Sequence, residues 1–137
     1  MIQIETTSHD PFFNQAFEDY VFRTYREGDV LLLWRNRPAV VVGCYQNICR
    51  EVHVRALLDR GIPVVRRMSG GGTVYHDLGN LNYTLISDQT GPLDYDRCLE
   101  PVIRALNALG IPAQKNRTCD IAVDGKKISG SADASTM

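Results

Sequence analysis

The sequence predicts an α+β fold in which short strands and hairpins share one domain with packed helices. Two stretches predict a β-hairpin: 30–43, with apolar runs on both sides of a turn, and 121–128, where an apolar run leads into Asp124-Gly125. Three others, 10–28, 51–61 and 96–110, have apolar residues at helical spacing and end at a glycine. The 137 residues suffice for one core, and no repeat or linker composition divides them.

A strand is expected at residues 2–4, and the first helix should begin at Asp10 and Pro11, a capping carboxylate followed by proline. Asn14 and Glu18 lie one turn apart on this helix. They are expected on a solvated face or supporting the cap, with an entry to a pocket as the alternative. The apolar side of the helix is predicted to consist of Phe13, Phe17, Tyr20, Val21 and Thr24.

Residues 30–34 and 39–43 are dense apolar runs, so we expect a hairpin of two largely buried strands that turns at 35–38. The next helix should cover 51–60 and end at Gly61, and a strand at 62–66 should follow it. The side chains of this helix expected to face inward are Val54, Leu57 and Leu58.

After a turn at 76–80 and a strand at 81–86, a helix is expected from about 96 to 109. Pro101 fits that helix only in its first turn or at a kink. The dipeptide Asp124-Gly125 suits a type I′ turn and predicts the second hairpin, with Lys126 and Lys127 on opposite faces.

Composition narrows the classes of function. With 15 basic and 16 acidic residues the net charge is −1, so neither nucleic acid nor an anionic membrane is an expected partner, and any anion site must be local. No basic start leads into an apolar run, and no stretch is long enough to span a bilayer. The cysteines show no C-x-x-C pattern and no zinc-type spacing with the histidines, which favours a cytoplasmic protein with reduced thiols; they are Cys44, Cys49, Cys98 and Cys119.

The segment from Arg66 and Arg67 through Ser69 to the three glycines 70–72 is the most informative one. Consecutive glycines let backbone N–H groups converge on an anion, and two guanidiniums add fixed positive charge. We therefore predict an anion-binding loop, the alternative being a hairpin turn with solvated arginines. The P-loop and dinucleotide-binding patterns do not fit, because a β pattern and no helix follows the glycines.

A second small-residue segment, 126–131, carries the lysine pair. If it converges with the glycine loop, the site would suit a nucleotide or an acyl phosphate.

Several segments together resemble, in order, the motifs of lipoate-protein ligase, a member of the biotin/lipoate A/B protein ligase family. They cover essentially the whole chain, and the central segment is highly specific. The segments are Asn14-Gln15-Ala16-Phe17-Glu18, Trp34-Arg35-Asn36 with Val40-Val41-Val42-Gly43 and Gln46-Asn47, residues 66–80, and Asp120-Ile121 with Lys127-Ile128-Ser129-Gly130-Ser131.

The resemblance implies a catalytic domain of mainly antiparallel mixed sheet with packed helices. It also implies an enzyme with two steps: lipoate and Mg-ATP give lipoyl-AMP and pyrophosphate, and the acyl group then passes to a lysine of a carrier. The implied ligands are ATP, Mg²⁺ and lipoate. The implied partners are the lipoyl domains of 2-oxoacid dehydrogenase complexes or the glycine cleavage H protein.

By position in these motifs, Lys127 is the implied essential lysine, bridging the carboxylate and the α-phosphate. Arg67 would contact the lipoate carboxylate or the adenylate phosphate, and Asp120 would lie near the phosphates or bind Mg²⁺. Arg66 is read equally well as a surface or structural arginine, and His76 as a turn residue or a supporting group. The other residues implied to bind nucleotide or lipoate are Ser69, Gly70, Gly71, Gly72, Thr73, Val74, Tyr75 and His76.

The sequence departs from the family pattern at two points. Cys119 stands where the family has asparagine, and the chain ends at Met137, where the family continues with further strands and often an accessory domain. Residues 1–137 are thus expected to be the N-terminal portion of one catalytic domain, either truncated or completed by a second chain. The alternatives are an octanoyltransferase supplied by acyl carrier protein and an inactive ligand-binding fragment. A biotin ligase is less favoured because its Gly-Arg-Gly-Arg loop is absent.

Overall fold

The computed structural model describes residues 1–25, 28–87 and 92–134. Within these ranges the chain forms three three-stranded sheets and four helices. Four of the strand pairs are antiparallel and two are parallel, which confirms the predicted α+β fold with mainly antiparallel mixed sheet. The chain divides into two compact units, residues 1–88 with 133–137 and residues 89–132, a division that no linker composition marks.

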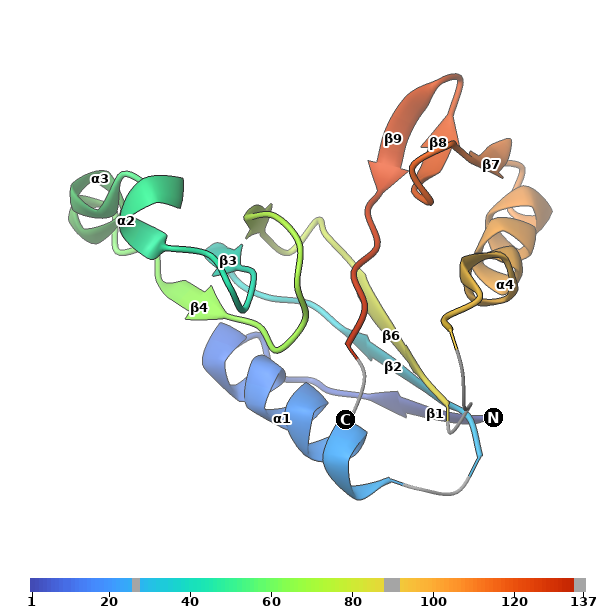
Figure 1. Ribbon diagram of the computed structural model, residues 1–137, viewed down its shortest axis with the longest axis horizontal. Helices are drawn as coiled ribbons and strands as arrows, with labels where there is room; N and C mark the ends of the chain where they lie inside the picture. Colours follow the sequence, from blue (N-terminus) through green and yellow to red (C-terminus); the bar gives the residue numbers. More distant parts are fainter. Residues whose placement is uncertain (26–27, 88–91, 135–137) are drawn as a thin grey trace. The chain divides into compact units, whose positions relative to one another are not determined.

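The first sheet of the larger unit has β2 (Val30–Trp34) at its centre. Its neighbours are β1 (Ile2–Glu5), which is parallel to it, and β6 (Asn82–Ile86), which is antiparallel (Figure 1). Helix α1 (Pro11–Thr24) covers this sheet, because Val21 packs on Val30 and Ile86 in one buried cluster.

Helix α1 begins as predicted but presents a different side to the core. The Asp10 carboxylate accepts hydrogen bonds from the amides of residues 12 and 13, at 2.9 and 3.1 Å, and these bonds, led by that of residue 13, lower its pKa. Phe13 and Tyr20 are 52% and 63% exposed, whereas Asn14 is 1% exposed. The expectation of a solvated Asn14 is therefore wrong, because backbone carbonyls of Ser8 and of the chain after β2 accept its N–H bonds.

The second sheet of the same unit has β3 (Ala39–Val42) between β4 (Val64–Arg66), which is parallel, and β5 (Val74–His76), which is antiparallel. The predicted hairpin of β2 with β3 is therefore wrong, although β3 is buried throughout as expected. The connection at 35–38 holds the buried Asn36 and carries the chain into another sheet instead of folding it back.

The predicted helix 51–60 is two short helices, α2 (Ile48–Glu51) and α3 (Val54–Asp59). His53 separates them and caps α3, since its Nδ1 accepts the amide N–H of residue 56 at 3.2 Å. Leu58 is 71% exposed, so its expected inward position is wrong; a six-residue helix covers only a narrow face. The glycine at 61 ends α3 with φ +62°.

The smaller unit packs α4 (Tyr95–Ala108) on a sheet of three antiparallel strands. The sheet consists of β7 (Ala113–Lys115), which the sequence did not indicate, β8 (Ile121–Val123) and β9 (Lys126–Ser129). The predicted second hairpin is confirmed as β8–β9, because residues 124 and 125 have φ of 50° and 73°, the positive values of a type I′ turn. Pro101 lies inside α4, beyond its first turn.

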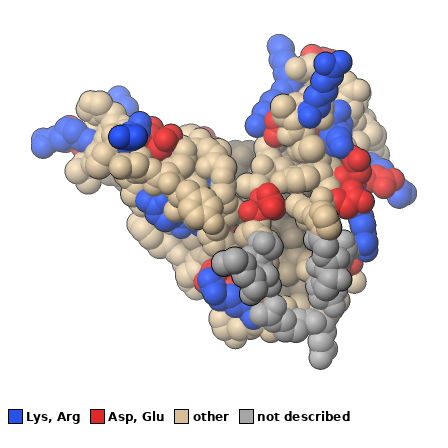
Figure 2. Space-filling model, viewed as in Figure 1, with Lys and Arg blue, Asp and Glu red and all other residues tan. Residues whose placement is uncertain are grey.

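The charged side chains on the face in Figure 2 are mixed in sign, with acidic groups beside basic ones. A near-zero net charge and this mixing agree with the expectation that an anion site is local. Of the helices in the described ranges, none combines the length and the apolarity that crossing a membrane requires.

Candidate functional site

The glycine loop closes around the Arg67 side chain. Its Nη2 donates to the carbonyls of Gly70 and Gly72 at 2.6 and 2.8 Å, and its Nε donates to the Ser69 hydroxyl at 3.0 Å. A further bond of 3.4 Å joins Nη1 to the Val41 carbonyl. Because a guanidinium presents its donors in a rigid fork, Arg67 holds the loop in one shape. Burial lowers its pKa, although Arg67 stays charged.

Arg66 holds a second loop, residues 43–46, against the first. Its Nη1 donates to the carbonyls of Gly43, Cys44 and Gln46 at 2.8, 3.1 and 2.8 Å. These bonds support the structural reading of Arg66, although the residue is exposed at the surface, so the alternative of a solvated arginine is wrong only for Arg67.

The Gln46 side chain ties the two loops together. Its Oε1 accepts the N–H of Gly43 at 2.9 Å and the hydroxyl of Thr73 at 2.8 Å. The backbones also touch, since the amide of Cys44 donates to the Ser69 carbonyl at 3.0 Å. Gly71, with φ +88°, lies directly against Gly43, so the site has glycine on both sides of this contact.

A chain of polar side chains crosses from α1 to the first sheet. The Trp34 indole donates to the Thr84 hydroxyl at 3.3 Å, and that hydroxyl donates to the Glu18 carboxylate at 2.6 Å. Gln15 donates to the other oxygen of the same carboxylate at 3.3 Å. Burial raises the pKa of Glu18, in part offset by these bonds and by the charge of Arg67. Glu18 thus faces the interior near Arg67, and the expectation of a solvated helix face is wrong for it too.

His76 is buried at the end of β5, where its ring meets Trp34 edge-on with centroids 5.9 Å apart. Its Nδ1 lies 3.2 Å from Nδ2 of the buried Asn36. Burial lowers the pKa of His76, and the positive charge of Arg67 lowers it further, so the ring is neutral near pH 7.

In the smaller unit, Lys127 and Asp120 form an ion pair with Nζ and Oδ1 3.1 Å apart. The second oxygen of Asp120 accepts the hydroxyl of Thr118 at 2.8 Å, and Asn116 accepts the Asp120 amide at 2.9 Å. These contacts, the Thr118 bond first, lower the pKa of Asp120. A Cβ on Gly130 would lie 3.0 Å from the Lys127 ammonium, so a glycine leaves room for it.

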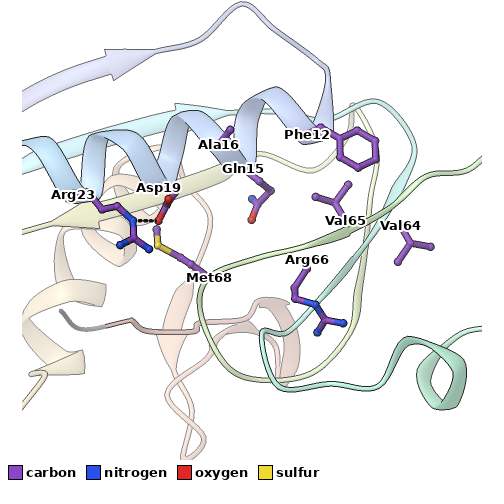
Figure 3. Close-up of a pocket in the computed structure, with 9 residues that line it drawn as sticks. All are labelled: Phe12, Gln15, Ala16, Asp19, Arg23, Val64, Val65, Arg66 and Met68. Carbon is purple, nitrogen blue, oxygen red and sulfur yellow. Dashed lines mark hydrogen bonds and ion pairs between the residues drawn. The ribbon is translucent and has the colours of Figure 1, made fainter. Parts of the chain in front are cut away.

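Two hollows adjoin the glycine loop in the larger unit. The first, of about 440 Å³, lies between α1 and the segment 64–68, and the residues that line it include Gln15 and Asp19 of α1 and Met68 of the segment (Figure 3). The second, of about 390 Å³, lies between α3 and β5 and is mostly apolar. Its walls include Thr73, Val74 and Tyr75, the segment predicted to line a nucleotide, and the last two are 44% and 54% exposed.

Metal binding has less support than anion binding. Over residues 1–25, 28–87 and 92–134, no three His, Cys, Asp or Glu side chains gather closely enough to hold an ion. Both carboxylate oxygens of Asp120, the candidate metal ligand, already have partners: Oδ1 contacts Lys127, and Oδ2 accepts the hydroxyl of Thr118. Mg²⁺ commonly binds through substrate phosphates with only one or two carboxylates, so a cluster of three protein ligands is not a requirement for that ion.

The structure brings the candidate residues 67–76 together in the larger unit and pairs Asp120 with Lys127 in the smaller one. The candidate site residues named from the sequence leave out several residues that support them. The signal that could have found most of these is their place in the family motifs. They are Glu18, Trp34, Asn36, Gly43, Gln46, Thr84, Asn116, Thr118 and Gly130.

The α+β fold, the glycine loop and the Lys127 hairpin together define a class of protein. Residues 10–136 match the family model described as the lipoyl protein ligase A/B catalytic domain, and the chain belongs to that family of enzymes.

Two curated relatives illustrate the likeness. The chain is 43% identical to lipoate-protein ligase LplJ of Bacillus subtilis over 131 residues, which are 93% of this chain and 40% of the relative. It is 41% identical to mitochondrial lipoyl amidotransferase LIPT1 of Mus musculus over 136 residues, 94% of this chain and 36% of that protein. The chain therefore spans about two fifths of the length of these relatives.

Solved structures agree with this assignment. The P. falciparum LipL1 structure in complex with lipoate superposes with a TM-score of 0.90 at 28% identity, covering 99% of this chain and 44% of that one. A lipoate-protein ligase A bound with ATP superposes with a TM-score of 0.85 at 28% identity, covering 98% of this chain and 60% of that one. A bi-partite lipoate protein ligase of Thermoplasma acidophilum, described with its E2 lipoyl domain, has a TM-score of 0.84 at 28% identity. The match covers 98% of this chain and 55% of that one.

Proposed function

We propose that this chain activates lipoate with ATP and passes the lipoyl group to a lysine of a lipoyl domain. The observation that carries the proposal is the family match over residues 10–136, which includes both the braced glycine loop and the Lys127 hairpin. The lipoate and the ATP found in two structural relatives support both substrates.

In the first step the lipoate carboxylate attacks the α-phosphorus of ATP, pyrophosphate leaves, and lipoyl-AMP forms. Negative charge builds on the non-bridging oxygens, where a fixed cation stabilises it best. Lys127 supplies that cation in the proposal. In the second step a lysine amine of the carrier attacks the acyl carbon, AMP leaves with the bonding electrons, and the amine proton is released.

Asp120 holds the Lys127 ammonium in the proposal, which is a role that its 3.1 Å ion pair supports. A cation fixed before the substrate arrives costs less reorganisation in the transition state. Mg²⁺ would neutralise the phosphates as part of Mg-ATP, and Asp120 is the carboxylate that we assign to it.

The glycine loop binds the anionic part of the ligand in this proposal. The amides of Gly70, Gly71 and Gly72 and the Ser69 hydroxyl would face lipoate or phosphate oxygens, with Arg67 setting the loop shape and its charge. The hollow of about 390 Å³ beside Thr73, Val74 and Tyr75 supports a nucleotide along that wall. His76 would complete the ligand site.

The carriers that we propose are lipoyl domains of 2-oxoacid dehydrogenase complexes, with the glycine cleavage H protein as a second candidate. The E2 lipoyl domain described with the Thermoplasma ligase supports the first. Because the chain spans about two fifths of its curated relatives, we also propose that residues 1–137 act as one part of the catalytic domain, with a second chain as the candidate for the rest.

A second candidate function is acyl transfer without ATP. The likeness to a relative named a lipoyl amidotransferase favours it, because that name describes a transferase and not a ligase. An octanoyl donor on acyl carrier protein is a related source of the acyl group.

The test is acyl-adenylate formation by the 137-residue chain with Mg-ATP and lipoate, then octanoate, followed by mass spectrometry. We expect lipoyl-AMP from the wild type and a loss of about a hundredfold or more in Lys127→Ala, as for other removed transition-state donors. Lys126→Ala is the matched control, since the two lysines are neighbours in β9. Adding a lipoyl domain should give a lipoylated lysine.

If Lys126→Ala lost as much lipoyl-AMP formation as Lys127→Ala, the role assigned to Lys127 would be wrong. A wild type that transfers octanoate or lipoate from a carrier without ATP would replace the ligase by the transferase. A chain that binds lipoate and ATP without forming the adenylate would be the ligand-binding fragment.

A further inference from the structure

The orientation of the Asn14 amide follows from its neighbours. Its Nδ2 lies 3.0 Å from the carbonyl oxygens of Ser8 and Arg35. Backbone carbonyls only accept hydrogen bonds, so the nitrogen of Asn14 must face them. The opposite orientation would place its oxygen against two other oxygens, in a position where the side chain is 1% exposed.

The orientation of Asn36 follows from that of Asn14. Nδ2 of Asn14 also lies 2.9 Å from Oδ1 of Asn36, so its two N–H groups are shared among three oxygens. An amide nitrogen is a donor and does not accept, so the Asn36 atom that faces it must be the oxygen. The remaining Asn36 atom is Nδ2, a donor, and it lies 3.2 Å from Nδ1 of His76. Because Asn36 is fully buried and held on both sides, its amide cannot turn without breaking both bonds.

The state of His76 follows in turn. A donor facing Nδ1 requires a lone pair there, so the proton of the neutral ring lies on Nε2. Protonating Nδ1 as well would set two N–H groups against each other, in a ring that is 9% exposed and edge-on to Trp34. In the part of the chain that the structure describes, no residue pairs with Nε2, which leaves this N–H for a ligand.

We propose that Asn14 and Asn36 are positioning residues that hold His76 as the Nε2–H tautomer, so that His76 meets the ligand as a neutral hydrogen-bond donor. The acceptor that suits this donor is an oxygen of an anionic ligand, such as a carboxylate or a phosphate. The ligand-facing role rests on the proposed function, because that function puts His76 in the ligand site; the tautomer does not depend on it.

The test is a two-bond ¹H–¹⁵N correlation spectrum of the ¹⁵N-labelled 137-residue chain near pH 7, in which the two ring nitrogens of each histidine are distinguished. The chain has three histidines, and His76→Gln identifies the resonances of His76. We expect an unprotonated Nδ1 and a protonated Nε2. A ring that carries its proton on Nδ1, or exchanges rapidly between the two tautomers, would overturn the proposal.

Asn36→Asp should reverse the direction of the hydrogen bond between residue 36 and His76. A carboxylate can still accept from Asn14 but offers an acceptor to His76, so Nδ1 of His76 should become protonated. His53 is the internal control, because a backbone N–H faces its Nδ1 and its spectrum should not change. A folded Asn36→Asp protein with an unchanged His76 spectrum would contradict the proposal that Asn36 sets the tautomer of His76. If this variant does not fold, the wild-type spectrum decides by itself.

Lipoate titration separates this inference from the proposed function. We expect lipoate to shift the His76 Nε2–H resonance, and Asn36→Asp to weaken lipoate binding by up to about tenfold, the size of one hydrogen bond. A reversed tautomer with unchanged affinity would refute the positioning role. A wild type with the expected tautomer that forms no adenylate would count against the ligase function alone.

Discussion

Gly43 packs so closely on Gly71 that a Cβ atom at residue 43 would lie 2.2 Å from the carbonyl oxygen of Gly71. This contact joins two segments that are distant in the chain, the end of β3 and the centre of the glycine loop. The obstructing atom belongs to the backbone, so it cannot turn aside as a side chain would. The requirement for glycine at residue 43 therefore comes from space, whereas at Gly71 it comes from its φ of +88°.

Gly43→Ala is expected to destabilise the protein by about 1–3 kcal/mol, the usual cost of forcing an extra methyl into a packed site. The measurement is the free energy of unfolding from urea titration. Gly72→Ala is the matched control, since a Cβ there meets nothing within 4 Å and residue 72 is not among the positive-φ glycines. Equal stability of the two variants would show that the loops separate in solution.

Arg67→Lys is expected to loosen the glycine loop. In Arg67, Nη2 donates to the carbonyls of Gly70 and Gly72 while Nε donates to the Ser69 hydroxyl. The single nitrogen of a lysine cannot make both sets of contacts, so amide hydrogen exchange at 69–72 should accelerate, and stability should fall by about 1–2 kcal/mol. Arg23→Lys, on an exposed arginine paired with Asp19, is the control and should leave exchange unchanged. Lost lipoate binding with wild-type exchange rates would mean that Arg67 acts only as a ligand contact.

Glu18→Gln is expected to change the pH dependence of stability. Burial raises the folded-state pKa of Glu18 above its ordinary value of 4.5, so the folded state binds the proton more tightly than the unfolded chain. This group therefore lowers stability as pH rises from about 4.5 through the raised pKa. In Glu18→Gln that decline should be absent.

The measurement for Glu18 is urea unfolding at a series of pH values, with Glu51→Gln in the exposed part of α2 as the control. The difference in stability between Glu18→Gln and the wild type should grow over the stated pH window. If the free energies of unfolding of the wild type and Glu18→Gln stay parallel across this pH range, Glu18 is hydrated in the folded protein.

Thr118→Val is expected to raise the pKa of Asp120 toward its ordinary value of 3.8, because the Thr118 hydroxyl is the main cause of the lowering. A lowered carboxyl pKa contributes stability above about 3.8, and this contribution is lost as pH falls through the folded-state value. The variant should lose less stability on acidification. Carboxyl ¹³C titration of Asp120 measures the shift, with Thr24→Val as an isosteric control far from the hairpin in sequence.

Sequence reasoning succeeded where neighbouring residues decide the structure. The Asp10 cap, the Asp124-Gly125 turn and the limits of most strands depend on local hydrogen bonds and on allowed φ values, which a short window contains. The family motifs also identified the glycine loop and the Lys127 hairpin. The sequence by itself thus determined the α+β class and the membership of the lipoyl protein ligase A/B family.

The tertiary structure decided which atoms these residues contact. Asn14 meets Asn36 across 22 residues, and Thr84 meets Glu18 across 66, so no local pattern could assign their burial or partners. The same holds for the separation of β2 and β3 into two sheets and for the carbonyls that occupy Arg67. A buried polar group must find a partner wherever the fold supplies one, and only the packed chain determines where that is.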